Sequence, residues 1–176
     1  MSTTLQQVPT DTYTVDPVHS SFGFGVRYNG LATFRSSFDK VDAQLADGVL
    51  SGSADARSIV IDEPRFKDHL LAGDFFDVEN TPTITFRSTD IRLAEDGTAE
   101  LDGDLTIRGV TKPVVLAGEY LGTTGDGAKQ RVGFHVTGKI NRMDYGVAWN
   151  RNLETGGVLL GDDVELDISI EAVRAS

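Results

Sequence analysis

The chain has 176 residues, enough for one domain with a sizeable buried core, and its hydrophobic content of 39% is typical of a globular protein. Its formal net charge of −11 disfavours binding to the phosphate backbone of nucleic acids and electrostatic docking on anionic membranes. Because the sequence contains no cysteine, disulfides, thiolate metal sites and thiol nucleophiles are excluded.

The N-terminal region reads MSTTLQQVPTDTYTVD and contains neither a basic segment nor an apolar run. We therefore expect no signal peptide, no membrane-spanning helix in the chain and a cytoplasmic protein. No linker, repeat or low-complexity stretch divides the rest of the chain. Residues 1–10 are expected to form a flexible segment and residues 11–174 a single domain.

Alternation of apolar and polar residues is the dominant pattern and indicates antiparallel strands, each with one buried face. The first clear case contains Phe22, Phe24 and Val26 on one face, and the last runs over residues 164–170. Turn signals such as Asn29-Gly30 separate the apolar runs, so the pattern predicts about eight strands. The same alternation recurs near residues 41–45, 84–86, 105–107, 114–116 and 132–136.

A short segment in the middle of the chain breaks this alternation and predicts a helix over residues 63–72. Asp62 is suited to cap its N-terminus, and Pro64 is suited to its first turn. Gly73 is suited to end it. The apolar residues of the segment would form one stripe along the helix.

The predicted strands must either close into a barrel or stack as two sheets. Closure removes the exposed sheet edges, and an eight-stranded barrel is wide enough to be filled by its own side chains or to hold one slim ligand. Alternation alone does not choose between a packed sandwich and a ligand-holding barrel.

Few residues form patterns that support catalysis or metal binding. His19, His69 and His135 lie on separate elements without the spacing of a zinc site, and His135 is expected to point outward. The sequence has no Gly-x-Ser-x-Gly elbow, no phosphate loop and no dinucleotide-binding motif. We therefore expect no catalytic residues, no bound metal and no enzyme activity.

Three arginines and the single tryptophan have two readings each. Arg108, Arg142 and Arg151 lie near glycine-containing turns, where they are either solvated surface residues or contacts for a polar headgroup. Trp149 is either a buried core residue or part of a cavity rim.

Several separated motifs occur in the order in which the YceI-like family carries them, over about residues 13–173. Each motif is weak alone, but together they are specific, and the chain resembles the YceI-like family. The motifs are Tyr13-x-Val15-Asp16-x-x-His19-Ser20, His69-Leu70 with Asp74-Phe75-Phe76, Pro82-x-Ile84-x-Phe86, Gly103-x-Leu105-Thr106-Ile107-Arg108-Gly109 and Ile140-Asn141-Arg142-x-Asp144-Tyr145-Gly146.

The resemblance implies an all-β fold: a single antiparallel eight-stranded lipocalin-like β-barrel with the short helix near one end. It also implies non-enzymatic binding, storage or transport of a long apolar lipid, such as a polyisoprenoid or isoprenoid quinone, in an interior tunnel. No cofactor other than this ligand is expected, and the sequence allows a homodimer. The alternatives are a packed barrel that acts through protein partners and an enzyme that modifies a lipid.

The inward-facing residues of the strands are expected to line the tunnel, and two aromatic residues after the helix are expected to close it. An error of one residue in any strand register would turn its side chains to the opposite face. The expected lining residues are Phe22, Phe24, Val26, Phe38, Ile84, Phe86, Leu105, Ile107, Leu116, Phe134, Val136 and Ile168, and the closing residues are Phe75 and Phe76.

Overall fold

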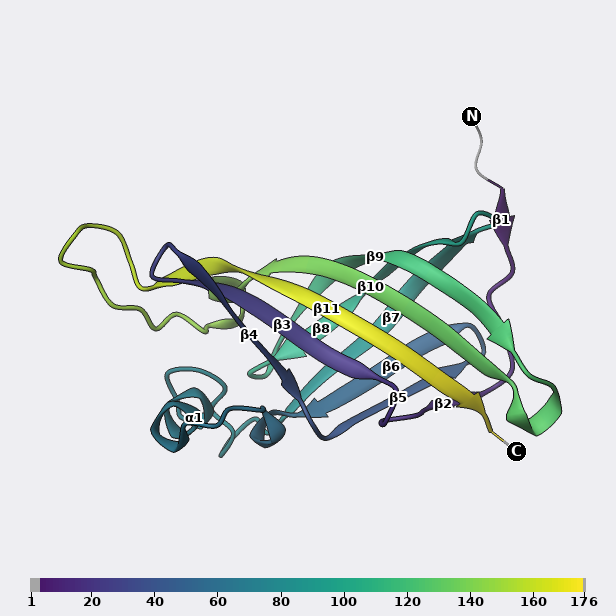
Figure 1. Ribbon diagram of the computed structural model, residues 1–176, viewed down its shortest axis with the longest axis horizontal. Helices are drawn as coiled ribbons and strands as arrows, with labels where there is room; N and C mark the ends of the chain where they lie inside the picture. The colour runs from purple at the N-terminus through teal and green to yellow at the C-terminus, as the bar shows by residue number, and fades with distance from the viewer. Residues whose placement is uncertain (1–3, 176) are drawn as a thin grey trace.

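The computed structural model describes residues 4–175, which form one antiparallel sheet and one α-helix, α1 (Pro64–Leu71). Figure 1 shows the sheet rolled into an elongated barrel, with α1 at one end and the described chain termini at the other. No helix among the described residues is long and apolar enough to span a bilayer. The strands are β1 (Leu5–Gln6), β2 (Tyr13–Val15), β3 (Ser21–Tyr28), β4 (Ala32–Phe38), β5 (Val41–Ala46), β6 (Val49–Asp55), β7 (Thr83–Ala94), β8 (Thr98–Ile107), β9 (Val110–Thr124), β10 (Arg131–Asn141) and β11 (Leu160–Arg174).

Eight strands close the barrel in the order β2-β5-β6-β7-β8-β9-β10-β11, and β11 returns to pair with β2. Closure gives hydrogen-bond partners to backbone groups that would be unpaired at a sheet edge. The prediction of an eight-stranded antiparallel barrel is therefore confirmed, and the alternative of two stacked sheets is not adopted. Leu5 and Gln6 pair with the end of β7, whereas residues 1–3 of the expected flexible segment lie outside the described part of the chain.

Two barrel positions are each occupied by two strands, β2 with β3 and β4 with β5, and these doubled positions together with β1 explain why eleven strands occur where alternation predicted about eight. Along one edge of β11, β2 pairs with residues 172–174 and β3 pairs with residues between 160 and 169. The following strands repeat this arrangement, since β4 pairs with β3 and β5 pairs with β2. Each pair of strands continues the same wall of the barrel after a short break.

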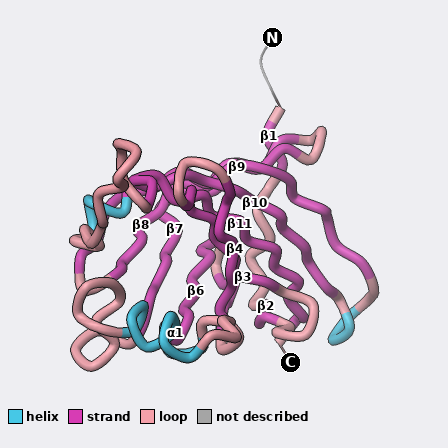
Figure 2. The backbone as a smooth tube through the Cα atoms, turned by 60° about the vertical axis from the view of Figure 1, so that its left-hand side comes forward, coloured by secondary structure: helices cyan, strands magenta, loops and turns pink. Residues whose placement is uncertain are grey.

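The barrel wall opens beside β4, and α1 lies at this opening. One edge of β4 pairs with β3. Within residues 4–175, the other edge forms backbone contacts only at the Phe38–Ile59 bridge and with the backbone of Val60. The chain then leaves the wall to form α1 before it returns as β7. Figure 2, in which helices are cyan, shows α1 at this end of the barrel, away from β1.

The helix begins and ends almost where the sequence predicts, but its caps differ. The carboxylate of Glu63, not that of Asp62, accepts a hydrogen bond of 2.6 Å from the backbone N–H of Phe66. Asp62 lies one residue too far upstream to cap a helix that starts at Pro64. At the other end Ala72 caps in extended conformation, so the helix stops without a left-handed glycine at position 73.

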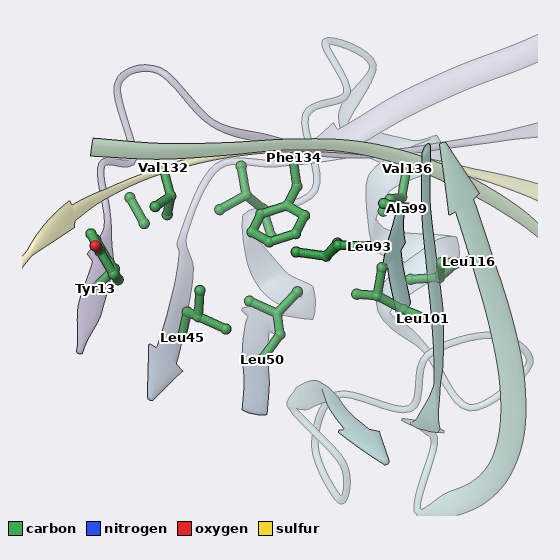
Figure 3. Close-up of a cluster of buried hydrophobic side chains, with 12 residues drawn as sticks. Tyr13, Leu45, Leu50, Leu93, Ala99, Leu101, Leu116, Val132, Phe134 and Val136 are labelled. Atoms are coloured by element: carbon green, nitrogen blue, oxygen red, sulfur yellow. The ribbon is translucent and has the colours of Figure 1, made fainter. Parts of the chain in front are cut away.

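Buried side chains fill the half of the barrel that contains the chain termini (Figure 3). All eight barrel strands contribute to this cluster, so their side chains meet at the barrel axis. We call these residues the packed end: Tyr13, Leu45, Leu50, Leu93, Ala99, Leu101, Leu116, Val132, Phe134, Val136, Ile170 and Ala172.

Candidate ligand-binding cavity

The half of the barrel next to α1 encloses a cavity of about 340 Å³. Ligand pockets in proteins usually start at about 300 Å³, so this space can hold a small or slim molecule. The wall is mainly aliphatic and aromatic, and it includes eight of the nine phenylalanines in the chain. The packed end forms the floor, because Leu50, Leu116, Val136 and Ile170 belong both to it and to the cavity wall.

Thirteen of the fourteen residues expected to line or close the tunnel lie on the wall of this one cavity. The structure brings them together because alternate residues of a strand share a face and the barrel turns these faces inward. Whether they contact a ligand stays a prediction. The thirteen are Phe22, Phe24, Val26, Phe38, Phe75, Phe76, Ile84, Phe86, Leu105, Ile107, Leu116, Val136 and Ile168.

Phe134 is the exception and corrects the expected set. Its side chain faces the interior but is buried in the packed end (Figure 3). The Phe134 ring lies 5.1 Å from the ring of Tyr120. Val136, two residues along the same face of β10, lines the cavity. Alternation reports the face of a side chain and not its depth along the barrel axis, so it could not separate these two residues.

Some wall residues were missed by the sequence analysis for two different reasons. Phe34, Val164 and Leu166 belong to the alternating pattern, and extending that pattern along each strand would have found them. His69 and Leu159 come from α1 and from the loop before β11. The position of such residues depends on how the helix and the loops fold over the opening. The two-residue alternation along strands carries no information about this.

Aromatic rings attach α1 and its flanking segments to the mouth of the cavity. The ring of His69 packs edge-on against Phe75 and Trp149, with centroids 5.0 and 4.8 Å away. Phe66 on α1 packs edge-on against Phe34 on β4 at 5.3 Å. Trp149 therefore has the rim position that was one of its two expected roles, and side chains rather than a hydrogen-bonded ladder hold this end together.

Arg142 is a buried cation that organises the loop before β11. Its guanidinium donates hydrogen bonds of 2.6, 2.9 and 2.7 Å to the carbonyl oxygens of Val147, Trp149 and Gly161. Burial lowers the pKa of Arg142 from its usual value, and the carboxylate of Asp162, 3.9 Å away, opposes this effect. Because these carbonyls already use its donors, Arg142 supports the mouth and does not offer a free charge to a headgroup.

Arg108 ties the segment after α1 to the turn between β8 and β9. Its backbone adopts the left-handed conformation in that turn, with φ of 58°. Its guanidinium donates hydrogen bonds to the carbonyl oxygens of Gly73 and Phe75. These two hydrogen bonds make the half-buried Arg108 a positioning residue for Phe75. Arg151 is exposed on the loop before β11.

Tyr145 carries a buried side-chain oxygen that has no hydrogen-bond partner in the described chain. The residue is 1% exposed and lies on the cavity wall. Burial, together with the nearby charge of Asp144, raises the pKa of Tyr145 to about 12, so the hydroxyl stays neutral at physiological pH. The residue supplies an unused polar group in otherwise apolar surroundings.

A titratable cluster lies apart from the cavity, where β2 gives way to β3. Asp16, His19 and Glu171 bring one potential ligand atom each within 4.8 Å of one another. Arg131 already donates a 2.8 Å hydrogen bond to Asp16 and lies 3.5 Å from Glu171. The hydrogen bond from Arg131, and then that from His19, holds the pKa of Asp16 well below its usual range. The cluster is therefore an ion-pair network in which the positive charge of Arg131 offsets the negative charges of Asp16 and Glu171.

The other two histidines lie outside this cluster and apart from each other. His135 lies on the outer face of β10, as expected, and hydrogen-bonds with Asp167 at 3.0 Å. His69 lies at the cavity mouth, 3.4 Å from the carboxylate of Asp74. The fold therefore does not bring His19, His69 and His135 together.

Solved structures share this barrel. BcnA of Burkholderia cenocepacia superposes with a TM-score of 0.74 at 22% identity, covering 89% of this chain and 98% of BcnA. A domain from Saccharophagus degradans, described as polyisoprenoid-binding and implicated in plant cell wall breakdown, superposes with a TM-score of 0.67 at 14% identity. That match covers 93% of this chain and 98% of the domain. At these identities the likeness establishes the fold.

Sequence comparison defines the family. A UPF0312 protein of Staphylococcus aureus strain MSSA476 is 34% identical over 170 residues, which cover 90% of this chain and 95% of that protein. The model of the YceI-like domain matches residues 13–172, which span the whole barrel from β2 into β11. The chain therefore belongs to the YceI-like family.

Proposed function

We propose that the protein binds a long apolar molecule, a polyisoprenoid or a similar lipid, in the cavity at the α1 end of the barrel. The observation that carries this proposal is a deep cavity, open at its mouth, whose wall includes eight phenylalanines and no unpaired charge among the described residues. The description of the Saccharophagus degradans domain as polyisoprenoid-binding supports the same ligand class. The proposed role is binding, storage or transport without catalysis.

Burial of hydrocarbon supplies enough free energy for tight binding. Each methylene removed from water contributes about 0.8 kcal/mol, so ten buried methylenes give about 8 kcal/mol. This corresponds to a Kd near 1 μM before the costs of association and chain ordering are subtracted. Ligand binding should also stabilise the fold, because an empty apolar cavity lacks the dispersion contacts that a ligand would restore.

The closed floor limits how a ligand is held. Phe22 and Tyr28, at the two ends of the lining face of β3, both line the cavity. Six residue steps along a strand span about 20 Å. A linear molecule would therefore place one end near the packed end and extend for at most about 20 Å toward the mouth, and any longer portion would fold back or project beyond the barrel.

The proposal is tested by extracting the purified protein with organic solvent and identifying lipids by mass spectrometry. We expect Phe24→Asp, which places a carboxylate on the cavity wall, to abolish lipid content. Leu121→Asp, at an exposed leucine on β9 that does not line the cavity, should keep the wild-type content. Circular dichroism verifies that both variants fold. Equal lipid content in folded Phe24→Asp and Leu121→Asp, or no lipid uptake by the wild type from detergent, would contradict the proposal.

A further inference from the structure

Two turns project beyond the cavity mouth and carry exposed apolar side chains. They are the turn between β3 and β4 and the loop before β11, which lie at the same end of the barrel as α1 (Figure 1). Leu31 in the first turn is 81% exposed, and Tyr28 and Val158 beside it are also exposed. The backbone N–H of Asn29 donates a 2.7 Å hydrogen bond to the carbonyl of Leu159, so the two turns are joined.

This exposed apolar surface is continuous with the cavity. Tyr28 and Leu159 line the cavity wall, and Tyr28 pairs with Leu160 at the end of β3. Leu31 follows Tyr28 within the same turn, where its N–H bonds to the carbonyl of Tyr28. We call Tyr28, Leu31, Val158 and Leu159 the rim. Apolar groups thus extend from the inner wall to the exposed turn between β3 and β4.

Charge distinguishes the rim hairpin from the rest of the chain. Residues 17–38, which contain β3 and β4, include no aspartate or glutamate, although the chain has 27 such residues and a net charge of −11. The hairpin carries two arginines, Arg27 and Arg35. Arg27 donates a 3.3 Å hydrogen bond to the carbonyl of Leu31, and Arg35 lies 3.7 Å from Glu165. The hairpin itself therefore adds no carboxylate that would repel phosphate-bearing headgroups, and Glu154 is the one acidic residue between positions 150 and 158 of the adjoining loop.

We infer that the rim inserts into the surface of a zwitterionic lipid bilayer and so places the cavity mouth against the membrane. This inference rests on the proposed lipid-binding function. A long apolar ligand that leaves a bilayer through water must expose every methylene, whereas a mouth seated on the bilayer keeps the path apolar.

A second copy of the chain fits the rim less well than a bilayer. A stable protein interface needs a broad complementary surface of about 800 Å² on each partner. The rim consists of two narrow turns whose tips also carry polar and glycine residues, among them Asn29, Gly30 and Gly156. Isolated apolar side chains on such tips suit insertion into a fluid surface.

The test measures binding to phosphatidylcholine vesicles by flotation. Leu31→Glu replaces the apolar side chain of this turn by a carboxylate, and we expect it to weaken vesicle binding at least about tenfold, the affinity equivalent of burying one leucine side chain. Transfer of a fluorescent polyprenol from vesicles to protein should slow by a similar factor. The matched control is Leu121→Glu, at a 64% exposed leucine on β9, which should bind and transfer like the wild type.

Lipid loading from detergent separates this inference from the proposed function. We expect Leu31→Glu to load as much lipid from detergent as the wild type at equilibrium. Normal loading with unchanged vesicle binding in Leu31→Glu would overturn the membrane role and leave the lipid-binding proposal intact. Equal losses of vesicle binding in Leu31→Glu and Leu121→Glu would also overturn the membrane role. So would a wild type that does not bind vesicles, including one that forms a dimer which Leu31→Glu dissociates.

Discussion

Tyr145 places a neutral hydroxyl inside the barrel where the described chain gives it no hydrogen-bond partner. An unpaired buried polar group costs about 1–3 kcal/mol, because it loses its hydrogen bonds to water. Its ring, in contrast, packs in the cluster that surrounds the cavity. The hydroxyl therefore opposes the stability of the ligand-free protein while the ring supports it.

Replacement of Tyr145 by phenylalanine separates these two effects. We expect Tyr145→Phe to raise the free energy of unfolding of the ligand-free protein by about 1 kcal/mol, since the ring remains and the unpaired donor is removed. Urea denaturation measures the change. Tyr13→Phe is the matched control, because Tyr13 is also a buried tyrosine but its hydroxyl donates a 2.6 Å hydrogen bond to Gln130. Tyr13→Phe should lose about 1 kcal/mol, and a similar loss in Tyr145→Phe would contradict the prediction.

At the level of single residues, the sequence predicted the face of each strand residue but not its surroundings. Phe24 and Phe134 look alike in the alternating pattern, yet one lines the cavity and the other is packed beside Tyr120. Arg142 and Arg108 could not be assigned either, because their partners are backbone carbonyls of loops. Such contacts depend on tertiary structure and leave no periodic signal.

Among the elements, α1 covers the place where the barrel wall is weakest. The helix was predictable because its apolar residues do not recur at every second position, as they do in the strands, and because Pro64 suits the first turn of a helix. Its position over the opening beside β4 was not predictable, since it depends on ring contacts such as Phe66 with Phe34. Segments held by few side-chain contacts open at lower free energy than a barrel wall. We therefore expect ligands to pass through this end.

Arg108 provides a way to loosen this cover without altering the cavity wall. Arg108→Ala removes the hydrogen bonds to the carbonyls of Gly73 and Phe75, so the segment after α1 should open more often. We expect faster hydrogen exchange over residues 72–78 and faster lipid release, with little change in global stability. Arg87→Ala, at an exposed arginine on β7, is the control and should exchange like the wild type. Unchanged exchange in Arg108→Ala would show that the hydrogen bonds from Arg108 do not hold the segment closed.

The whole molecule divides into a packed half and a hollow half along one barrel. The packed end takes side chains from all eight barrel strands and contributes stability that the hollow half, with its missing dispersion contacts, does not. Closure of eight strands was predictable from alternation combined with the family resemblance. The depth at which packing gives way to the cavity was not, because it depends on how side chains from different strands fit at the same level of the barrel.

Because the packed end closes the cavity, the affinity for a linear ligand should rise with chain length and then reach a plateau. In a series of linear alcohols, each added methylene should tighten binding about fourfold, the equivalent of about 0.8 kcal/mol, until the chain fills the depth of about 20 Å. Longer chains should then bind with nearly constant affinity, because added methylenes remain in water. Isothermal titration calorimetry or the shift in Tm measures the series.

The floor of the cavity should set the length at which affinity levels off. Val136 lies where the packed end meets the cavity, so Val136→Phe should add bulk at the floor and move the plateau to shorter chains. Phe134→Ala should open space below the floor and move it to longer chains, at a cost in stability of about 3–5 kcal/mol that calls for measurement below the lowered Tm. A plateau at the same length in both variants, or affinity that rises without limit, would place the hydrocarbon outside the barrel.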